Sequence, residues 1–150
     1  AALKKPRLES GESMKRGLVC LALMFAANVW AIDLSMPPTK SAATANVERG
    51  RKLLINRQET GCVLCHRIPG MKEGGEMGPV LSGLSQRMSA DQIRQRIADW
   101  RAVNPQTFMP AYFSSKGLHN VAKPLVGKTV LTEQGLEDIV AYLLDATKGP

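Results

Sequence analysis

Two cysteines and a histidine stand close together in the middle of the chain, as Cys62-Val63-Leu64-Cys65-His66. Cys-x-x-Cys-His is the attachment pattern of a c-type haem, in which each thiol adds to a vinyl group of the porphyrin. Two intervening residues match the separation of the vinyl groups, and the next position places the imidazole below the iron. The motif therefore predicts one covalently bound haem c, held through Cys62 and Cys65, with His66 as an iron ligand.

Three other uses of these side chains agree less well with the rest of the sequence. A structural zinc site needs four ligands, and beyond the leader described below the chain offers two cysteines with only His66 and His119, outside the spacing of a zinc finger. A redox-active dithiol normally stands at the end of a strand in an α/β pattern, which is absent here. A simple disulfide would leave the adjacent histidine unexplained. Haem attachment is the interpretation that uses all three side chains.

The opposite face of the iron needs a second ligand or must stay open for chemistry. We expect Met109 to fill it, because it lies far from His66 in the sequence and Pro105 and Pro110 stiffen its loop. The alternative for Met109 is the commonest role of methionine, filling gaps in a core. With both axial positions filled, substrate cannot reach the iron, so we expect no catalytic residue. The other candidate ligands are Met36, Met71, Met77, Met88 and His119.

Helical periodicity predicts three main helices, and no strand pattern competes with them. Each helix begins after a residue that can cap an N-terminus, namely Asn46, Ser89 and Thr132, and Ser89 opens a capping box. Gly50 lies on the apolar face of the first helix. We therefore expect this helix to cross the third closely, with Gly50 facing the region of Tyr142. The periodic apolar positions are Val47, Leu54 and Ile55; Ile93, Ile97 and Trp100; and Leu136, Ile139, Val140, Leu143 and Leu144.

Long loops should connect these helices, from Pro69 to Gly83 and from Asn104 to Gly127. Because residues beyond 31 contain only five aromatic side chains, a small chain with such loops lacks apolar material for a core. We therefore expect an all-α fold with three main helices around a haem.

The Gly78 to Gly83 segment, which contains a proline, is expected to accept a hydrogen bond from the second ring nitrogen of His66 and so to fix the orientation of the imidazole ring.

Charge and a leader-like segment bear on where the protein works. The 150 residues carry 20 Lys and Arg against 13 Asp and Glu, a formal net charge of +7. No basic stripe is interleaved with aromatics, which argues against nucleic-acid binding. Residues 14–31 combine a positive start, an apolar centre and a small residue at the end, which predicts a cleaved signal peptide and export of the protein, with a retained membrane anchor as the alternative. We interpret residues 1–13 as non-native or upstream sequence, residues 32–44 as a linker and residues 45–150 as the domain.

With these motifs the chain resembles the monohaem cytochromes c, and more narrowly the SoxX family, the small cytochrome subunits of SoxAX thiosulfate-oxidising complexes. The resemblance covers residues 45–147 and implies a class I cytochrome c fold. Three of its motifs occur in many cytochromes c, and they are Gly61 to His66, Gly78 to Gly83 and Leu131 to Leu143. The other two, Ile97 to Arg101 and Asn104 to Tyr112, narrow the resemblance to SoxX.

For function, the resemblance implies iron ligation by His66 and Met109, a periplasmic location and a heterodimer with a SoxA-like cytochrome subunit. Such a complex is an L-cysteine S-thiosulfotransferase that joins thiosulfate to a cysteine of the carrier protein SoxYZ, and its electrons leave to a downstream cytochrome. The chain would be the electron-transfer subunit and not catalytic alone. The alternative is a free-standing soluble cytochrome c that shuttles electrons between respiratory complexes.

Overall fold

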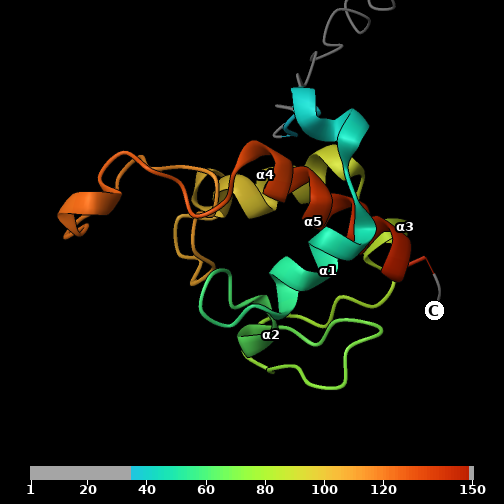
Figure 1. Cartoon of the computed structure of the whole chain (residues 1–150). Helices are drawn as coiled ribbons and strands as arrows, with labels where there is room; N and C mark the ends of the chain where they lie inside the picture. The colour runs from blue at the N-terminus through green and yellow to red at the C-terminus, as the bar shows by residue number, and fades with distance from the viewer. Residues whose placement is uncertain (1–34, 149–150) are drawn as a thin grey trace, which may run out of the picture. The chain divides into compact units, whose positions relative to one another are not determined.

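Helices form all the regular structure in the computed structural model, which describes residues 35–148 (Figure 1). This part of the chain contains no strand, which confirms the all-α expectation. The elements are η1 (Lys40–Thr44), α1 (Val47–Ile55), α2 (Cys62–Cys65), α3 (Leu84–Arg87), α4 (Ala90–Asp99), η2 (Trp100–Ala102), η3 (Lys123–Leu125) and α5 (Glu133–Ala146). Within residues 35–148, no helix is long and apolar enough to cross a membrane. The expected leader and the segment before it lie outside the described residues.

The three main helices, α1, α4 and α5, begin where the sequence predicts, because a polar side chain caps the first turn of each. Asn46 Oδ1 accepts a hydrogen bond from the backbone N of Arg49 at 2.9 Å. Thr132 Oγ1 accepts one from the backbone N of Gly135 at 3.0 Å. Ser89 forms the expected reciprocal capping box at the start of α4. These bonds satisfy amides that have no partner within the helix.

Helices α1 and α5 pack closely at Gly50, which is buried. A Cβ atom on Gly50 would overlap the carbonyl oxygen of Asp138 and lie 3.1 Å from the backbone N of Ile139. Only a residue without a side chain lets the two backbones approach this far. The expected crossing is therefore confirmed, with the contact about one helical turn before Tyr142. Buried Leu54 extends the packing of α1 against the core.

A buried ion pair joins α4 to α5. The Nε and Nη2 atoms of Arg94 donate to the two carboxylate oxygens of Glu137 at 2.8 and 3.0 Å, and the side chains are only 3% and 2% exposed. Burial by itself would raise the pKa of Glu137, but hydrogen bonds from Arg94 and from the backbone N of Thr39 outweigh it and lower the pKa. The bidentate geometry fixes the relative placement of the two helices.

Residues 35–44, which belong to the segment interpreted as a linker, are held against these helices. The carbonyl oxygen of Met36 accepts a hydrogen bond from Nη1 of Arg94 at 2.8 Å. The backbone N of Ser41 donates to a carboxylate oxygen of Glu133 at 3.1 Å. The local sequence, with its prolines and small residues, indicates a tether. The contacts that hold this segment in place come from side chains many residues later in the chain, so the local sequence does not indicate them.

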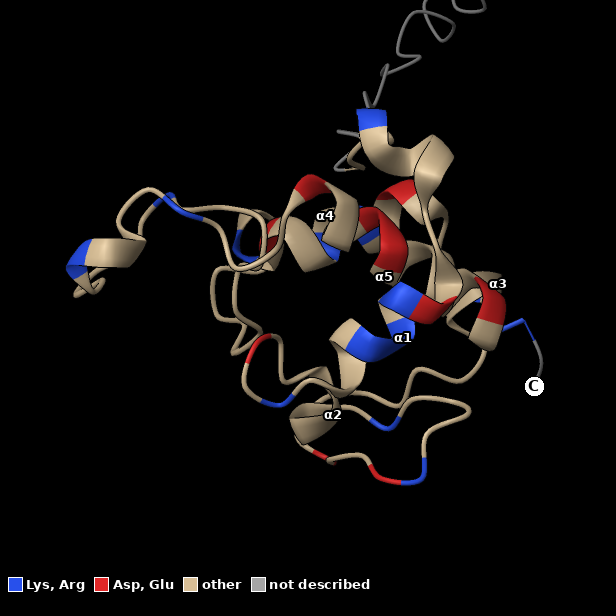
Figure 2. Ribbon diagram, in the orientation of Figure 1, with Lys and Arg blue, Asp and Glu red and all other residues tan. Residues whose placement is uncertain are grey.

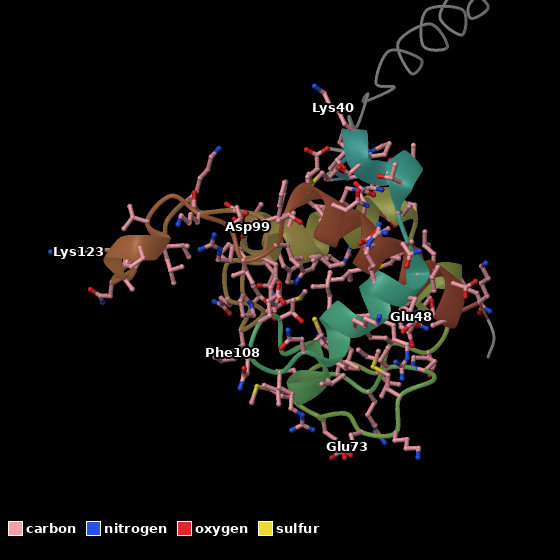
Figure 3. The ribbon with its side chains drawn as sticks, viewed as in Figure 1. Lys40, Glu48, Glu73, Asp99, Phe108 and Lys123 are labelled. Carbon is pink, nitrogen blue, oxygen red and sulfur yellow. The ribbon has the colours of Figure 1, made fainter. Side chains whose placement is uncertain are left out.

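Two long connections complete the fold, as the Gly and Pro content predicts. The first, residues 66–83, carries the cavity wall beside α2. The second, residues 103–132, includes η3, and its part around η3 projects away from the main helices, with Lys123 near the far end (Figures 1 and 3). The short elements α2, α3 and η3 lie in regions without a predicted helix, because one turn is too short to show a helical period.

Candidate functional site

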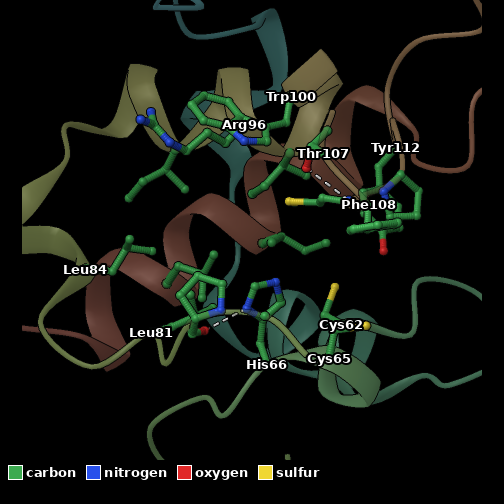
Figure 4. Close-up of a pocket in the computed structure, with 18 of the residues that line it drawn as sticks. Cys62, Cys65, His66, Leu81, Leu84, Arg96, Trp100, Thr107, Phe108 and Tyr112 are labelled. Atoms are coloured by element: carbon green, nitrogen blue, oxygen red, sulfur yellow. Dashed lines mark hydrogen bonds between the residues drawn. The ribbon is translucent and has the colours of Figure 1, made fainter. Parts of the chain in front are cut away.

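A cavity of about 540 Å³ lies between α2, the C-terminal part of α4, residues 104–112 and α5 (Figure 4). Its lining is largely apolar, with Ile97, Leu131, Ile139 and Leu143 among the buried side chains that reach it. Pockets that enclose a bound small molecule or cofactor have volumes of about 300 to 1,000 Å³. The helices therefore surround a space of cofactor size. This agrees with the sequence, which has too few large apolar side chains to fill the centre of the domain by itself.

Both cysteines of the attachment motif line this cavity, and they form no disulfide with one another. They begin and end α2, a single turn that follows Gly61, whose φ of 62° is left-handed. Such a backbone favours glycine. Burial raises the pKa of the Cys62 thiol. One helical turn thus brings Cys62 and Cys65 to the same wall.

The imidazole of His66 is oriented by the loop that follows. Nδ1 lies 2.8 Å from the carbonyl oxygen of Pro79, which confirms the hydrogen bond expected from this segment. Because a carbonyl oxygen only accepts, Nδ1 carries the proton and Nε2 keeps a free lone pair. Gly78 lies against the ring, and a Cβ atom there would be 2.6 Å from Nδ1 and 2.9 Å from Nε2. Figure 4 shows the ring pointing into the cavity.

Residues 104–112 form the wall that faces His66. Figure 4 shows Thr107 and Phe108 across the cavity from the imidazole. The Oγ1 atom of Thr107 accepts a hydrogen bond from the backbone N of Met109 at 3.1 Å, and the backbone N of Thr107 donates to the carbonyl oxygen of Asn104 at 3.1 Å. Met109 is half-buried against the core and lines the cavity. Local turns therefore fix the loop that carries the predicted distal ligand.

The other candidate ligands differ in position. Met77 lines the cavity, but its side chain is 80% exposed and it directly precedes Gly78, on the same side as His66. Met88 lines the cavity at the C-cap of α3. Met109 is the lining methionine on the loop that faces the imidazole, and its ligation of iron stays a prediction. The candidates among residues 35–148 that do not line the cavity are Met36, Met71 and His119.

Two groups on the cavity wall were not assigned a role from the sequence. The guanidinium of Arg96 lies 4.1 Å from the ring centroid of Trp100, and their i,i+4 spacing on one helix face was a visible signal for this contact. Arg96 makes no ion pair within residues 35–148, so its positive charge is available to an acidic group in the cavity.

The second group is the phenol of Tyr112. Burial raises the pKa of Tyr112 to about 12, and its hydroxyl donates a hydrogen bond to the carbonyl oxygen of Thr60 at 2.8 Å.

The donor set agrees with the chemistry of haem c. Two thiols stand on one wall, an imidazole with a free Nε2 enters the cavity beside them, and a thioether lies on the wall opposite. An apolar enclosure with one arginine suits a macrocycle that is apolar except for its two propionates. The described residues contain no cluster of His, Cys, Asp and Glu for another metal ion.

Comparison with known proteins gives the class. Residues 47–147 match the sequence profile of the cytochrome c family, so the chain belongs to that family, and it is an electron-transfer protein with covalently bound haem c. No curated protein matches the chain. The structure is similar to a chain of the crystal structure of SoxXA from P. pantotrophus, with 28% identity, a TM-score of 0.60 and coverage of 69% of this chain and 83% of that one. A second similar structure is the c-type cytochrome SorU from Sinorhizobium meliloti, with 22% identity, a TM-score of 0.47 and coverage of 69% and 92%.

Proposed function

We propose that this cytochrome is the electron-transfer subunit of a SoxAX-type complex, which oxidatively couples thiosulfate to a cysteine of a carrier protein in the periplasm. The observation that carries the proposal is the likeness to a chain of SoxXA, at 28% identity over 69% of this chain. The partner would be a SoxA-like cytochrome subunit, the carrier SoxYZ and the final acceptor a downstream cytochrome. In this proposal residues 14–31 are a leader removed on export, and residues 45–150 form the working domain.

The site residues take the following roles in the proposal. Cys62 and Cys65 form thioethers with the haem, and His66 and Met109 are the axial ligands of its iron. The hydrogen bond from Nδ1 of His66 to Pro79 supports this assignment, because it leaves Nε2 as the metal-binding nitrogen. Haem c supplies a one-electron store when bound. A thioether with a histidine raises the reduction potential, which favours acceptance of electrons.

The number of thiols and haems in this chain indicates what the partner subunit must supply. Coupling a cysteine thiol to thiosulfate forms an S–S bond and releases one proton and two electrons. The chain beyond residue 31 has only Cys62 and Cys65, and thioether formation uses both. Its single haem takes one electron. We therefore infer that the partner provides both the reacting sulfur site and a place for the second electron, and that this chain is inactive alone.

The deciding experiment incubates thiosulfate, the carrier protein and an electron acceptor with this chain alone, and then with its copurified SoxA-like partner. Mass spectrometry of the carrier measures the thiosulfate adduct. We expect the adduct only with the pair. Adduct formation by this chain alone at the rate of the pair would overturn the assignment. Elution of the protein as a monomer from cells that also produce the partner would favour the free-standing shuttle.

A second experiment tests the attachment residues. Extraction of the denatured protein with acidic organic solvent should leave the haem on the polypeptide, as a band that stains for peroxidase activity. Cys62→Ser with Cys65→Ser should release it. Haem that leaves the unaltered polypeptide would refute attachment at these positions. The mass of the exported protein reports leader removal in the same sample.

A further inference from the structure

The segment from Ser114 to Val130 projects from the domain and is called here the basic arm (Figures 1 and 3). Nearly all of it is exposed, including every residue from 122 to 130. A Cβ atom on Gly127 would meet nothing within 4 Å, so the arm has no packing partner at that turn. Because long irregular loops in small domains usually carry function, the arm requires an explanation that the haem site does not supply.

The arm has a defined path and a fixed base. At the base, the backbone N of Leu131 donates to the carbonyl oxygen of Tyr112 at 2.8 Å, and Nη2 of Arg101 donates to the carbonyl oxygen of Lys116 at 2.9 Å. Along the arm, Asn120 and Gly127 adopt left-handed backbones, and η3 closes the tip with turn hydrogen bonds. The two residues at the base, Tyr112 and Leu131, also line the haem cavity.

The arm combines positive charge with exposed apolar side chains. It contains Lys116, Lys123 and Lys128, and no Asp or Glu occurs between Asp99 and Glu133 (Figure 2). None of the three lysines forms an ion pair within residues 35–148. Four large apolar side chains on the arm are 42% to 66% exposed, and they are Leu118, Leu125, Val126 and Val130. Large exposed apolar side chains next to charged ones are typical of protein interaction sites.

We propose that the basic arm is the docking element for the partner subunit, which receives it in an apolar groove bordered by carboxylates. The inference rests on the proposed function, since it deepens the claim that a partner subunit exists. The arm supplies three lysines that form no ion pair, and an apolar tip that consists of Leu125 and Val126. Complementary carboxylates would steer the encounter, and burial of the tip would slow dissociation.

A second copy of this chain is a poor occupant for the arm. Eight of the ten carboxylates in residues 35–148 already pair with the chain's own Arg or Lys side chains. Among the described residues, only Glu59 and Glu133 form no ion pair, which is too few to match three lysines. An anionic membrane is also disfavoured, because the arm has no aromatic residue and no amphipathic helix to enter the interface. The arm's chemistry therefore favours a different, acidic protein.

The test uses the full haem-loaded chain and the SoxA-like protein of the same organism, with the dissociation constant measured by calorimetry or biolayer interferometry. One variant reverses the charge of the arm through Lys116→Glu, Lys123→Glu and Lys128→Glu. A second removes the apolar tip through Leu125→Ser and Val126→Ser. The matched controls are Lys40→Glu, Lys52→Glu and Lys72→Glu, which also change three exposed lysines without ion pairs, and Val47→Ser with Ile55→Ser, both 40% exposed.

We expect each arm variant to raise the dissociation constant at least about tenfold, and each control to change it less than about threefold. Charge reversal should also weaken the dependence of binding on salt between about 0.05 and 0.5 M. The haem spectrum should not change, because the substitutions lie outside the cavity lining. Equal affinity of the arm variants and the controls would overturn the arm proposal and leave the proposed function intact.

Other outcomes separate the two ideas further. If the unaltered chain fails to bind the SoxA-like protein, the proposed function and the arm proposal both fail. If the arm variants lose self-association, or lose binding to vesicles that contain anionic lipid, while partner binding is unchanged, the arm serves a different occupant and the proposal is overturned.

Discussion

Replacing Gly50 by alanine tests the close crossing of α1 and α5. The new Cβ atom would overlap the carbonyl oxygen of Asp138, lie 2.5 Å from its carbonyl carbon and lie 3.1 Å from the backbone N of Ile139. All three atoms belong to the backbone of α5, so no side chain can rotate away. Carbon atoms in contact prefer separations of about 3.5 to 4.0 Å. The two helices must therefore move apart by about 1 Å at this point.

The energetic cost follows from that displacement. A gap of about 0.5 to 1 Å forfeits a quarter to a half of each contact energy along the interface, and overpacking of this kind typically costs about 1 to 3 kcal/mol. Alanine recovers about 0.5 to 1 kcal/mol through its higher helix propensity. We expect Gly50→Ala to destabilise the haem-loaded protein by about 1 to 2 kcal/mol, with a larger loss for Gly50→Val.

Thermal unfolding of the haem-loaded protein measures the effect. For a domain of this size, the expected loss corresponds to a Tm lower by about 4 to 8 °C or more. The matched control is Gly135→Ala in α5, where a Cβ atom would be 3.3 Å from the ends of the Leu53 and Thr132 side chains. The Leu53 side chain can rotate away, and the contact with the capping Oγ1 of Thr132 is only slightly short, so this variant should stay within about 1 kcal/mol of the unaltered protein. Equal Tm values for Gly50→Ala and Gly135→Ala would refute the close backbone contact.

Three further predictions concern the site and the ion pair. Met109→Ala should abolish the weak far-red absorption of sulfur-ligated ferric haem and lower the reduction potential. Gly78→Ala should destabilise the protein by about 1 to 3 kcal/mol in a denaturant titration, because its Cβ displaces the ring of His66. Glu137→Gln should cost about 3 kcal/mol by leaving Arg94 without its buried partner. Because the pKa of Glu137 is lowered in the fold, its contribution to stability is complete above about pH 4.3 and should disappear as the pH falls through the folded pKa.

Each of these has a contrary result. An unchanged spectrum of Met109→Ala would transfer ligation to another methionine or to His119. A Gly78→Ala protein with an unaltered unfolding midpoint would show that the imidazole tolerates a neighbouring methyl group. Equal acid dependence of Tm in the unaltered protein and in Glu137→Gln would show that this carboxylate does not contribute to the loss of stability at low pH.

The sequence by itself determined the features that depend on residues within a few positions of one another. The spacing of Cys62, Cys65 and His66 indicates covalent haem, because attachment needs these groups within one turn. The caps at Asn46, Ser89 and Thr132 are equally local, since a cap bonds to an amide two or three residues ahead. Periodicity predicts the three helices for the same reason.

Tertiary structure decided what depends on the path of the chain through space. The partner of Arg94 is Glu137, 43 positions away, and no local pattern indicates that these two charges meet. The loop near Pro79 was predictable as a partner of His66, but the close approach of Gly78 to the ring was not. Likewise, the sequence prefers Met109 to Met77 for its distance from His66, but only the fold shows Met77 exposed beside Gly78 and Met109 on the loop that faces the imidazole. Contacts between distant segments form only after the entropy of loop closure has been overcome by packing of the whole domain, which short sequence patterns do not encode.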